Sequence, residues 1–324
     1  MLGQYWQYLI LIPTTILHLV LSLKDRKTLK PPGEFIDLGG HKVHLWVKGT
    51  GKTTVVLDHS LGGIEGYFLV EAISKLTRVC VYDRPGYGWS DSSPKPRCSG
   101  EIVQELDLML TRANLQPPYI LVGDSFGSYN IRLYAHQFPE KVKGIILTDG
   151  LHESGMLNLP WSITAVKYLF ISGFVMSIFG SVVGIIRLAG LGGLFELIKP
   201  ELKQFSSLQR QRVKRSFYHY RHWLTMAREL LNLNRSSRQL KVAQDFNVPI
   251  ISIKSQTFFK PSIFTLLLPL KEIDRLRDKM HHHLSLLSGN FTEISAANSS
   301  HFVWIDQPEV MLEAIRQLLG NPSY

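Results

Sequence analysis

The chain has 324 residues, of which 45% are hydrophobic and only two are cysteine. Such a length and apolar content suffice for one large buried core, which excludes a disulfide-stapled miniprotein and a disordered segment. The formal net charge is +10, but the basic residues are dispersed and no nucleic-acid-binding motif accompanies them. We therefore expect an anionic membrane surface, not nucleic acid, as the partner of these charges. Cys80 lies in an apolar strand pattern and Cys98 in a polar loop, so no disulfide framework is indicated, and a cytosol-facing domain is compatible with both.

The N-terminal segment, residues 1–30, predicts a membrane anchor and its basic flank. Residues 5–23 contain no charged side chain and can just span a bilayer. The residues that make the flank basic are Lys24, Arg26, Lys27 and Lys30. A cleaved signal peptide is disfavoured because these charges follow the apolar run without a small-residue cleavage site. The flank predicts a single-pass anchor with the rest of the chain in the cytoplasm. Three glycosylation sequons, which would argue for the opposite side, begin at Asn234, Asn290 and Asn298.

Strand and helix patterns alternate along the rest of the chain, which predicts a mostly parallel sheet flanked by helices. We expect this core to comprise residues 31–153 and 245–324. The buried strands are expected at 54–58, 119–122, 144–148, 248–253 and 291–294, and a terminal helix at 308–319. About a hundred residues separate the third and fourth of these strands, more than one crossover helix needs, so a helical cap is predicted at 154–244.

The predicted cap has two halves of different character. Residues 170–186 are uncharged and could be read as a second transmembrane helix. We favour apolar cap helices that roof a pocket or dip into a membrane surface, because a span would separate consecutive strands of one sheet. The second half, residues 201–241, is basic and helical, and we expect it to form the solvated face of the lid.

Residues 123–127, Gly-Asp-Ser-Phe-Gly, spell G-x-S-x-G between an apolar strand and a segment with helical spacing. A strand that turns abruptly into a helix holds the middle residue in a strained conformation, and glycines on both sides allow the strand and helix to pack closely. The pattern predicts that Ser125 is a nucleophile. The alternative is a Gly- and Ser-rich turn with no chemistry.

A serine nucleophile requires a histidine base and a carboxylate that orients it. His301 lies in the loop between the last predicted strand and the terminal helix, which fits the chain order serine, acid, histidine. The rival cluster, residues 281–283, consists of three adjacent histidines that cannot all face one site. We expect these three on a solvated helix face, and we predict no metal site and no cofactor.

The predicted acid is Asp149, because it ends the strand at 144–148 and the carboxyl ends of neighbouring parallel strands share one rim. In the alternative interpretation this aspartate only caps the following turn. Glu153, Glu272 and Asp274 are weaker candidates, since none lies at a strand end.

The turn at residues 59–63 follows a buried strand and consists of small residues that can gather backbone amides. We expect the amides of Phe126 and Leu61 to stabilise an oxyanion. Gly62 and Gly63 could equally be ordinary loop glycines.

Residues 79–91, VCVYDRPGYGWSD, resemble the YDR-x-GYGWSD segment of α/β-hydrolase-fold esterases and lipases. With residues 123–127, 147–153 and His301, the similarity spans residues 34–320. Two departures are His59-Ser60, where many members have His-Gly, and Asp124, where histidine, asparagine or glutamine is more usual. A third is the strand at 248–253, which lacks a following carboxylate near the usual acid position.

The resemblance implies acyl transfer to water through an acyl-serine. We therefore expect a membrane-anchored serine esterase or lipase that hydrolyses a hydrophobic, lipid-like carboxylic ester. An amidase or iminopeptidase would use the same triad. A non-catalytic binding protein of this fold is the other alternative, because of the missing carboxylate.

Overall fold

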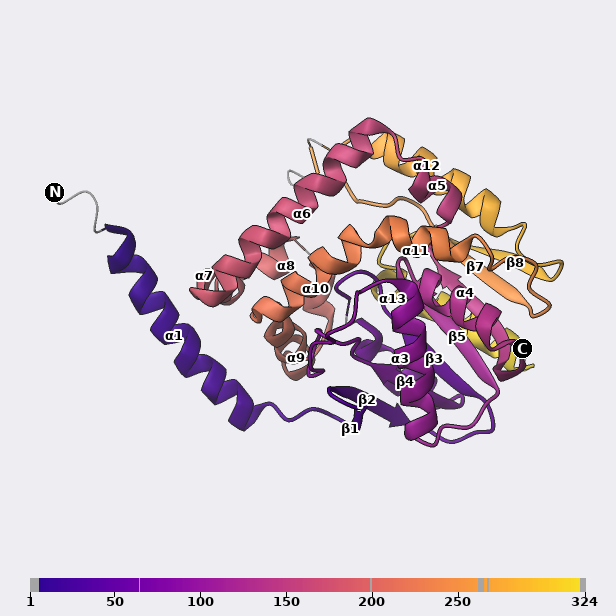
Figure 1. Cartoon of the computed structure of the whole chain (residues 1–324), viewed down its shortest axis with the longest axis horizontal. Helices are drawn as coiled ribbons and strands as arrows, with labels where there is room; N and C mark the ends of the chain where they lie inside the picture. The colour runs from indigo at the N-terminus through magenta and orange to yellow at the C-terminus, as the bar shows by residue number, and fades with distance from the viewer. Residues whose placement is uncertain (1–5, 64, 199, 262–264, 267, 321–324) are drawn as a thin grey trace.

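The computed structural model describes residues 6–63, 65–198, 200–261, 265–266 and 268–320 (Figure 1). Within them, an eight-stranded sheet has the order β1-β2-β4-β3-β5-β6-β7-β8. The first two strands, β1 (Glu34–Asp37) and β2 (Lys42–Lys48), pair antiparallel. The parallel strands are β3 (Thr54–Asp58), β4 (Arg78–Tyr82), β5 (Tyr119–Asp124), β6 (Val142–Thr148), β7 (Ile250–Ser255) and β8 (Phe291–Ala296). The predicted mostly parallel sheet is therefore confirmed.

Successive side chains of a strand point to opposite faces of the sheet, so the apolar core has two layers, one on each face. In β3, Val56 faces one layer, whereas Val55 and Leu57 face the other. The first layer is covered by α3 (Ser99–Arg112), α4 (Gly127–Gln137) and α12 (Leu270–Leu284). The second is covered by α2 (Val70–Ile73), α13 (Val303–Asp306) and α14 (Pro308–Leu319), whose bounds match the predicted terminal helix.

The helices between β6 and β7 lie at the carboxyl ends of the strands (Figure 1). They are α5 (Glu153–Leu157), α6 (Trp161–Val182), α7 (Ile185–Leu191), α8 (Leu194–Ile198), α9 (Ser207–Phe217), α10 (Tyr220–Leu231) and α11 (Leu233–Leu240). Short 3₁₀ turns occur at Glu65–Phe68, Pro139–Lys141 and Pro200–Gln204.

The two halves of this insertion lie at different depths in the molecule. The apolar helix α6 lies outside, where Met176 is 73% exposed and Phe179 is 69% exposed. The basic half lies inside: α10 buries His222 and Glu229, and α11 packs against α3, α4 and α5. The prediction of a solvated lid face at 201–241 is therefore wrong for α10 and α11. Polar side chains of these two helices are buried where they have partners on the core, as Glu229 has in Arg84 and Ser236 has in the Ser99 amide.

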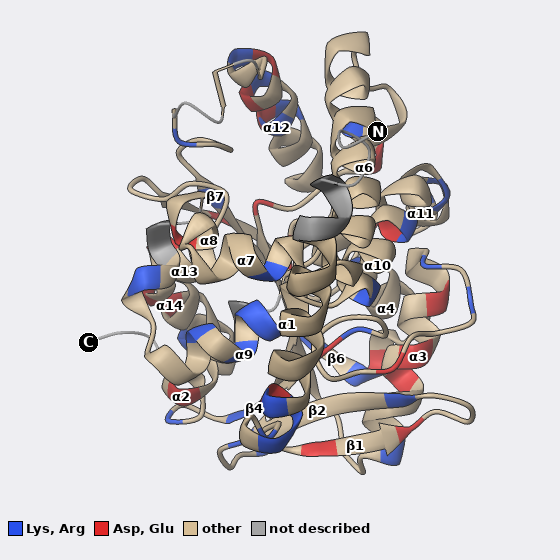
Figure 2. Ribbon diagram, turned by 90° about the vertical axis from the view of Figure 1, so that its left-hand side faces the viewer, with Lys and Arg blue, Asp and Glu red and all other residues tan. Residues whose placement is uncertain are grey.

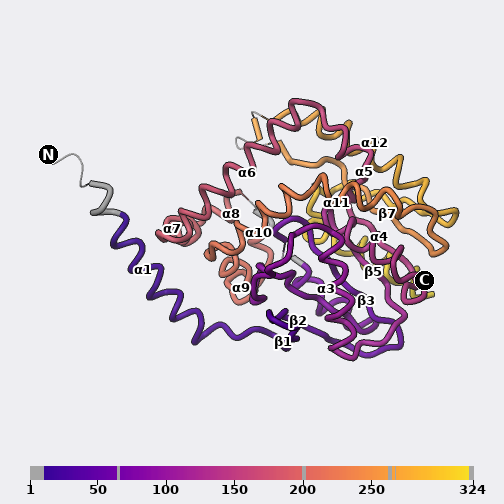
Figure 3. Tube along the Cα trace, in the orientation of Figure 1, coloured from indigo at the N-terminus to yellow at the C-terminus, as the bar shows by residue number. Residues whose placement is uncertain are grey.

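The N-terminal helix α1 (Trp6–Thr28) projects beyond the cap at one end of the molecule (Figure 3). Among the described residues, one helix, α6, is long and apolar enough to cross a membrane. The described side chains of α1 include Lys24, Asp25, Arg26 and Lys27, and this helix does not meet the same criterion. The structure thus supports a helix at the predicted anchor but not a membrane span, and Tyr5 lies outside the described residues.

Candidate active site

The G-x-S-x-G segment forms a sharp turn between β5 and α4. Ser125 has φ of 49°, in the left-handed region that residues with a side chain rarely adopt. A Cβ atom on Gly127 would lie 2.3 Å from the carbonyl oxygen of Asp58, so the start of α4 can approach β3 only with glycine at this position. A Cβ on Gly123 would lie 2.7 Å from the Gly127 backbone. The strand, serine and helix occur in the predicted order.

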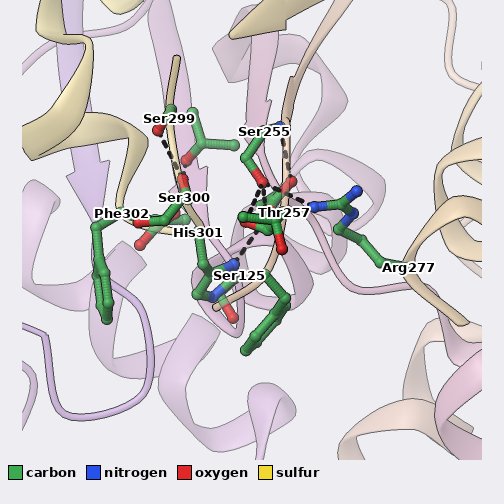
Figure 4. Close-up of polar contacts among 12 residues, drawn as sticks. Ser125, Ser255, Thr257, Arg277, Ser299, Ser300, His301 and Phe302 are labelled. Atoms are coloured by element: carbon green, nitrogen blue, oxygen red, sulfur yellow. Dashed lines mark hydrogen bonds and ion pairs between the residues drawn. The ribbon is translucent and has the colours of Figure 1, made fainter. Parts of the chain in front are cut away.

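Asp149 and His301 meet at the end of the strand next to Ser125. The Ser125 amide donates to the Thr148 carbonyl oxygen at 2.9 Å, which places the serine beside the residue that precedes Asp149. His301 Nδ1 lies 2.9 Å from Asp149 Oδ2. All three side chains are buried, and Figure 4 shows Ser125 together with His301 and the polar residues around it. The structure thus brings the three predicted residues to one rim of the sheet.

The Asp149 carboxylate has further hydrogen-bond partners. The Ser255 amide donates to Oδ1 at 3.0 Å, and the Ser255 hydroxyl donates to Oδ2 at 2.6 Å. Arg277 Nη1 donates to the same hydroxyl at 3.0 Å (Figure 4). Ser255 ends β7, where the sequence lacks the expected carboxylate. In place of a carboxylate, this position has a serine that donates two hydrogen bonds to Asp149, which directly follows β6.

His281 also contacts this carboxylate, since its Nε2 lies 3.3 Å from Asp149 Oδ1. Burial by itself would raise the pKa of Asp149, but hydrogen bonds from His281 and His301 hold that pKa far below its usual range. The aspartate is therefore ionised at neutral pH. An ionised carboxylate accepts from the imidazole Nδ1–H and favours the tautomer whose Nε2 is free to take a proton.

The expectation of a solvated face for the three consecutive histidines is wrong for His281, which is 1% exposed. His282 and His283 are exposed as expected. Helix α12 buries Arg277, Met280, His281 and Leu284, which have the spacing of one helical face. Adjacent residues on a helix point in different directions, so only one of the three reaches Asp149. The spacing from Arg277 to Leu284 was the signal that could have identified it.

The weaker acid candidates have other partners. Glu153 forms a buried ion pair with Arg132, with 3.0 Å between Oε2 and Nη1. Glu272 accepts a hydrogen bond from Ser162. Asp274 accepts from the Phe258 amide at 2.9 Å. Among the hydrogen bonds of the described residues, none joins these three carboxylates to His301.

Phe258 connects Asp274 to the histidine indirectly. Its ring stacks on the His301 imidazole with 3.9 Å between ring centroids, and its carbonyl oxygen accepts from the His301 amide at 3.3 Å. Asp274 therefore holds the segment that covers one side of the imidazole.

The turn after β3 is held by Arg84, a residue of the YDR segment whose role the sequence did not reveal. Its guanidinium donates to the carbonyl oxygens of His59 and Ser60. With these carbonyls fixed, the amide of Leu61 is presented on the same turn that packs against Gly127. Within the described residues, neither the Phe126 amide nor the Leu61 amide donates a hydrogen bond. Both donors are thus available to an anion.

Asp124, the unusual neighbour of the nucleophile, is held by its partner on β6. Its Oδ1 accepts from the Thr148 hydroxyl at 2.9 Å, and Trp304 Nε1 donates to the same hydroxyl at 2.8 Å. This network fixes the Asp124 side chain toward β6 and α13.

Residues 53–171, which include Ser125 and Asp149, match the family model of the alpha/beta hydrolase fold. The chain is an α/β-hydrolase-fold protein. The Cif epoxide hydrolase from Acinetobacter nosocomialis superposes on this α/β-hydrolase-fold chain with a TM-score of 0.67 at 13% identity, covering 94% of this chain and 96% of that one. The enol-lactonase from Burkholderia xenovorans LB400 gives a TM-score of 0.61 at 14% identity, covering 89% and 100%. At such identities the likeness shows the fold alone.

Among curated relatives, the uncharacterized protein YbdG of Bacillus subtilis is 28% identical over 171 residues, which cover 51% of this chain and 52% of YbdG. The chain thus spans about half the length of that relative. It matches smaller shares of others, for example 21% of the uncharacterized protein C23C11.06c of Schizosaccharomyces pombe.

The close packing at the turn between β5 and α4 leads to a prediction about stability. Gly127→Ala should lower the free energy of unfolding by about 1–3 kcal/mol or more, because the added methyl group overlaps the Asp58 carbonyl. Gly173→Ala is the matched control, since a Cβ there meets no atom within 4 Å and lies on exposed α6. Thermal melting of both variants measures the difference. Equal melting temperatures for the two would contradict the proposed packing constraint.

The contact between His281 and Asp149 makes a second prediction. His281→Leu should lower the free energy of unfolding by about 1.5–3 kcal/mol, because it removes a hydrogen bond to a buried carboxylate. His282→Leu, one residue along the same helix and exposed, should change it by about 0.5 kcal/mol at most. Denaturant titration of the two variants provides the comparison. Similar effects of both would mean that the His281 contact stabilises nothing.

Proposed function

We propose that this protein is a serine hydrolase that cleaves a hydrophobic, lipid-like carboxylic ester through an acyl-serine intermediate. The observation that carries the proposal is the strained Ser125 beside the hydrogen-bonded pair of His301 and Asp149. This arrangement matches the roles of nucleophile, base and orienting acid.

In the proposed reaction, His301 Nε2 takes the Ser125 proton as the hydroxyl oxygen attacks the ester carbonyl. The amides of Phe126 and Leu61 stabilise the oxyanion of the tetrahedral intermediate, and the ionised Asp149 stabilises the imidazolium. The imidazolium then gives its proton to the departing alcohol. Water, activated by the same imidazole, releases the acid from Ser125 and restores the enzyme.

A serine nucleophile favours an ester over an epoxide as the substrate. Epoxide hydrolases nevertheless occur among the structural neighbours. A serine that opened an epoxide would be left as an ether, which water does not readily cleave. An acyl-serine is an ester and can be hydrolysed. The enol-lactonase shares the fold and is named for a cyclic ester, which agrees with this choice.

The apolar outer helices support a hydrophobic substrate and a membrane location. We infer that α1 attaches the protein to a membrane and that the catalytic domain lies on the cytoplasmic side. Lys24, Arg26 and Lys27 follow the apolar part of α1, which favours this orientation.

Labelling with a fluorophosphonate probe tests the proposed chemistry. The intact protein should react covalently at Ser125, and Ser125→Ala should abolish labelling. A folded wild-type protein that is not labelled, or a Ser125→Ala variant that still is, would contradict the proposal. Comparing nitrophenyl esters of long and short acids with the matching anilides then separates esterase from amidase activity.

The role of Asp149 gives a further prediction. Asp149→Asn presents an amide donor to the imidazole and favours the wrong tautomer, so ester turnover should fall by about 10⁴-fold with folding largely kept. Asp274→Asn, which alters only the segment that covers His301, should do much less. Kinetics on titrated active sites, with thermal melting alongside, provide the measurement. Near-normal turnover by the labelled Asp149→Asn protein would rule out this aspartate as the acid.

A further inference from the structure

Helix α1 turns its polar side chains toward the cap. Thr14, His18, Ser22 and Asp25 recur at helical spacing and form one stripe. Thr14 Oγ1 donates to the Val183 carbonyl oxygen at 2.7 Å, at the junction of α6 and α7. The side of α1 that packs on the protein is thus its polar side.

One buried arginine from α7 contacts the rest of this stripe. Arg187 Nε donates to His18 Nδ1 at 3.2 Å, and Nη2 donates to the Ser22 hydroxyl at 3.0 Å. Its Nη1 forms an ion pair with Asp25 Oδ2 at 2.7 Å. The backbones also approach closely here, because a Cβ on Gly184 would lie 2.4 Å from the Thr14 carbonyl oxygen. These contacts fix α1 to the cap at a defined position.

The opposite side of α1 is apolar and exposed. Its side chains Ile12, Ile16, Leu19, Val20 and Leu23 are 56–58% exposed. A surface helix of a water-soluble protein has the reverse arrangement, with its apolar stripe against the core. A polar side packed on protein and an apolar side facing outward is the arrangement that suits lipid.

Helices α6 and α7 extend this apolar surface. Figure 2 shows α1 in front of the cap. The charged residues on α6 and α7 are Lys167 and Arg187, and those of α1 lie near its C-terminal end. The exposed side chains of α6 and α7 include Trp161, Leu169, Met176, Phe179, Ile185 and Leu191. The inner side of α6 packs on α10, where the Phe174 and Trp223 rings lie 6.2 Å apart. Helix α6 thus packs on the protein along one side and presents the apolar side chains of its other side outward.

We infer that α1, α6 and α7 form one lipid-facing surface, tied together by Arg187, that seats the cap on a bilayer containing anionic lipid. Lys24, Arg26 and Lys27 stand at the end of α1, where anionic headgroups would neutralise them. Trp161, at the start of α6, is 84% exposed and suits the interfacial region. The inference extends the proposed membrane association and is independent of the proposed chemistry.

Site-specific labels on the full-length chain test this surface. Cys80 and Cys98 are both buried, so a cysteine introduced on the surface can be labelled selectively with an environment-sensitive fluorophore. We choose Met176→Cys on α6, Ile16→Cys on α1 and, as control, Glu293→Cys on the exposed side of β8. With phosphatidylcholine vesicles that contain phosphatidylserine, emission at 176 and 16 should shift to the blue. Lipids with brominated acyl chains should quench both labels, and the control label should respond to neither.

Two outcomes would overturn the shared surface. Quenching at 16 without quenching at 176 would make α1 an isolated anchor. A blue shift at 176 that needs no vesicles and rises with protein concentration would mean that a second copy of the chain covers α6. Ser125→Ala should leave the quenching unchanged, so a failure of the proposed ester hydrolysis is distinguishable from a failure of docking.

The role of Arg187 is tested in the same assay. Arg187→Met should reduce quenching at 176 to the level of the Glu293 control while quenching at 16 persists, because α1 is then no longer tied to the cap. The paired exchange Arg187→Asp with Asp25→Arg should restore part of the signal, and circular dichroism establishes that each variant is folded. Unchanged quenching at 176 in folded Arg187→Met would exclude Arg187 as the tie.

Discussion

The parallel pairing of β5 with β6 is the constraint on which the rest of the site depends. Asp124 pairs with Thr148 in the strand register, so the residues that follow, Ser125 and Asp149, leave the sheet at the same level. Both have positive φ, 49° and 43°, which turns each backbone abruptly at the strand end. The end of β7 and the loop after β8 then bring Ser255 and His301 to this pair. Two adjacent strand ends thus place Ser125 and Asp149 side by side at the rim of the sheet.

The sheet and the turn between β5 and α4 could be predicted because each has a local sequence pattern. Apolar runs bounded by turn residues located the parallel strands, and G-x-S-x-G between a strand and a helix located Ser125. The position of Asp149 beside Ser125 follows from one further rule, that neighbouring parallel strands end at a common rim. This rule needs only the order of strands. The rule suffices to place Asp149 because this residue directly follows its strand. Neither the rotation of a helix nor the path of a loop has to be known.

The remaining contacts depend on what the buried side of each helix meets on the sheet. The spacing from Arg277 to Leu284 indicates one buried side of α12, but only the packing of α12 on β7 brings His281 and Arg277 to Asp149 and Ser255. The burial of polar residues in α10 and α11 has the same origin. A basic, polar sequence normally predicts a solvated face, but buried charges are tolerated where partners satisfy them, as Glu229 is by Arg84 and Tyr87. The partners lie over a hundred residues away in the chain, so composition alone cannot show them.

The pair of Arg84 and Glu229 makes the cap part of the site. Arg84 holds the carbonyl oxygens of His59 and Ser60 on the turn after β3, and its Nε lies 3.1 Å from a Glu229 carboxylate oxygen on α10. Removing one partner of a buried ion pair costs about 3–5 kcal/mol, because the other charge is left uncompensated. Arg84 has a second buried partner, Asp58, so it would keep one ion pair if α10 moved away from the core. The Arg84–Glu229 pair thus joins α10 to the turn after β3. The outer side of α10 packs against α6. The turn that contains Leu61 is therefore connected to the apolar outer surface through Arg84, α10 and α6.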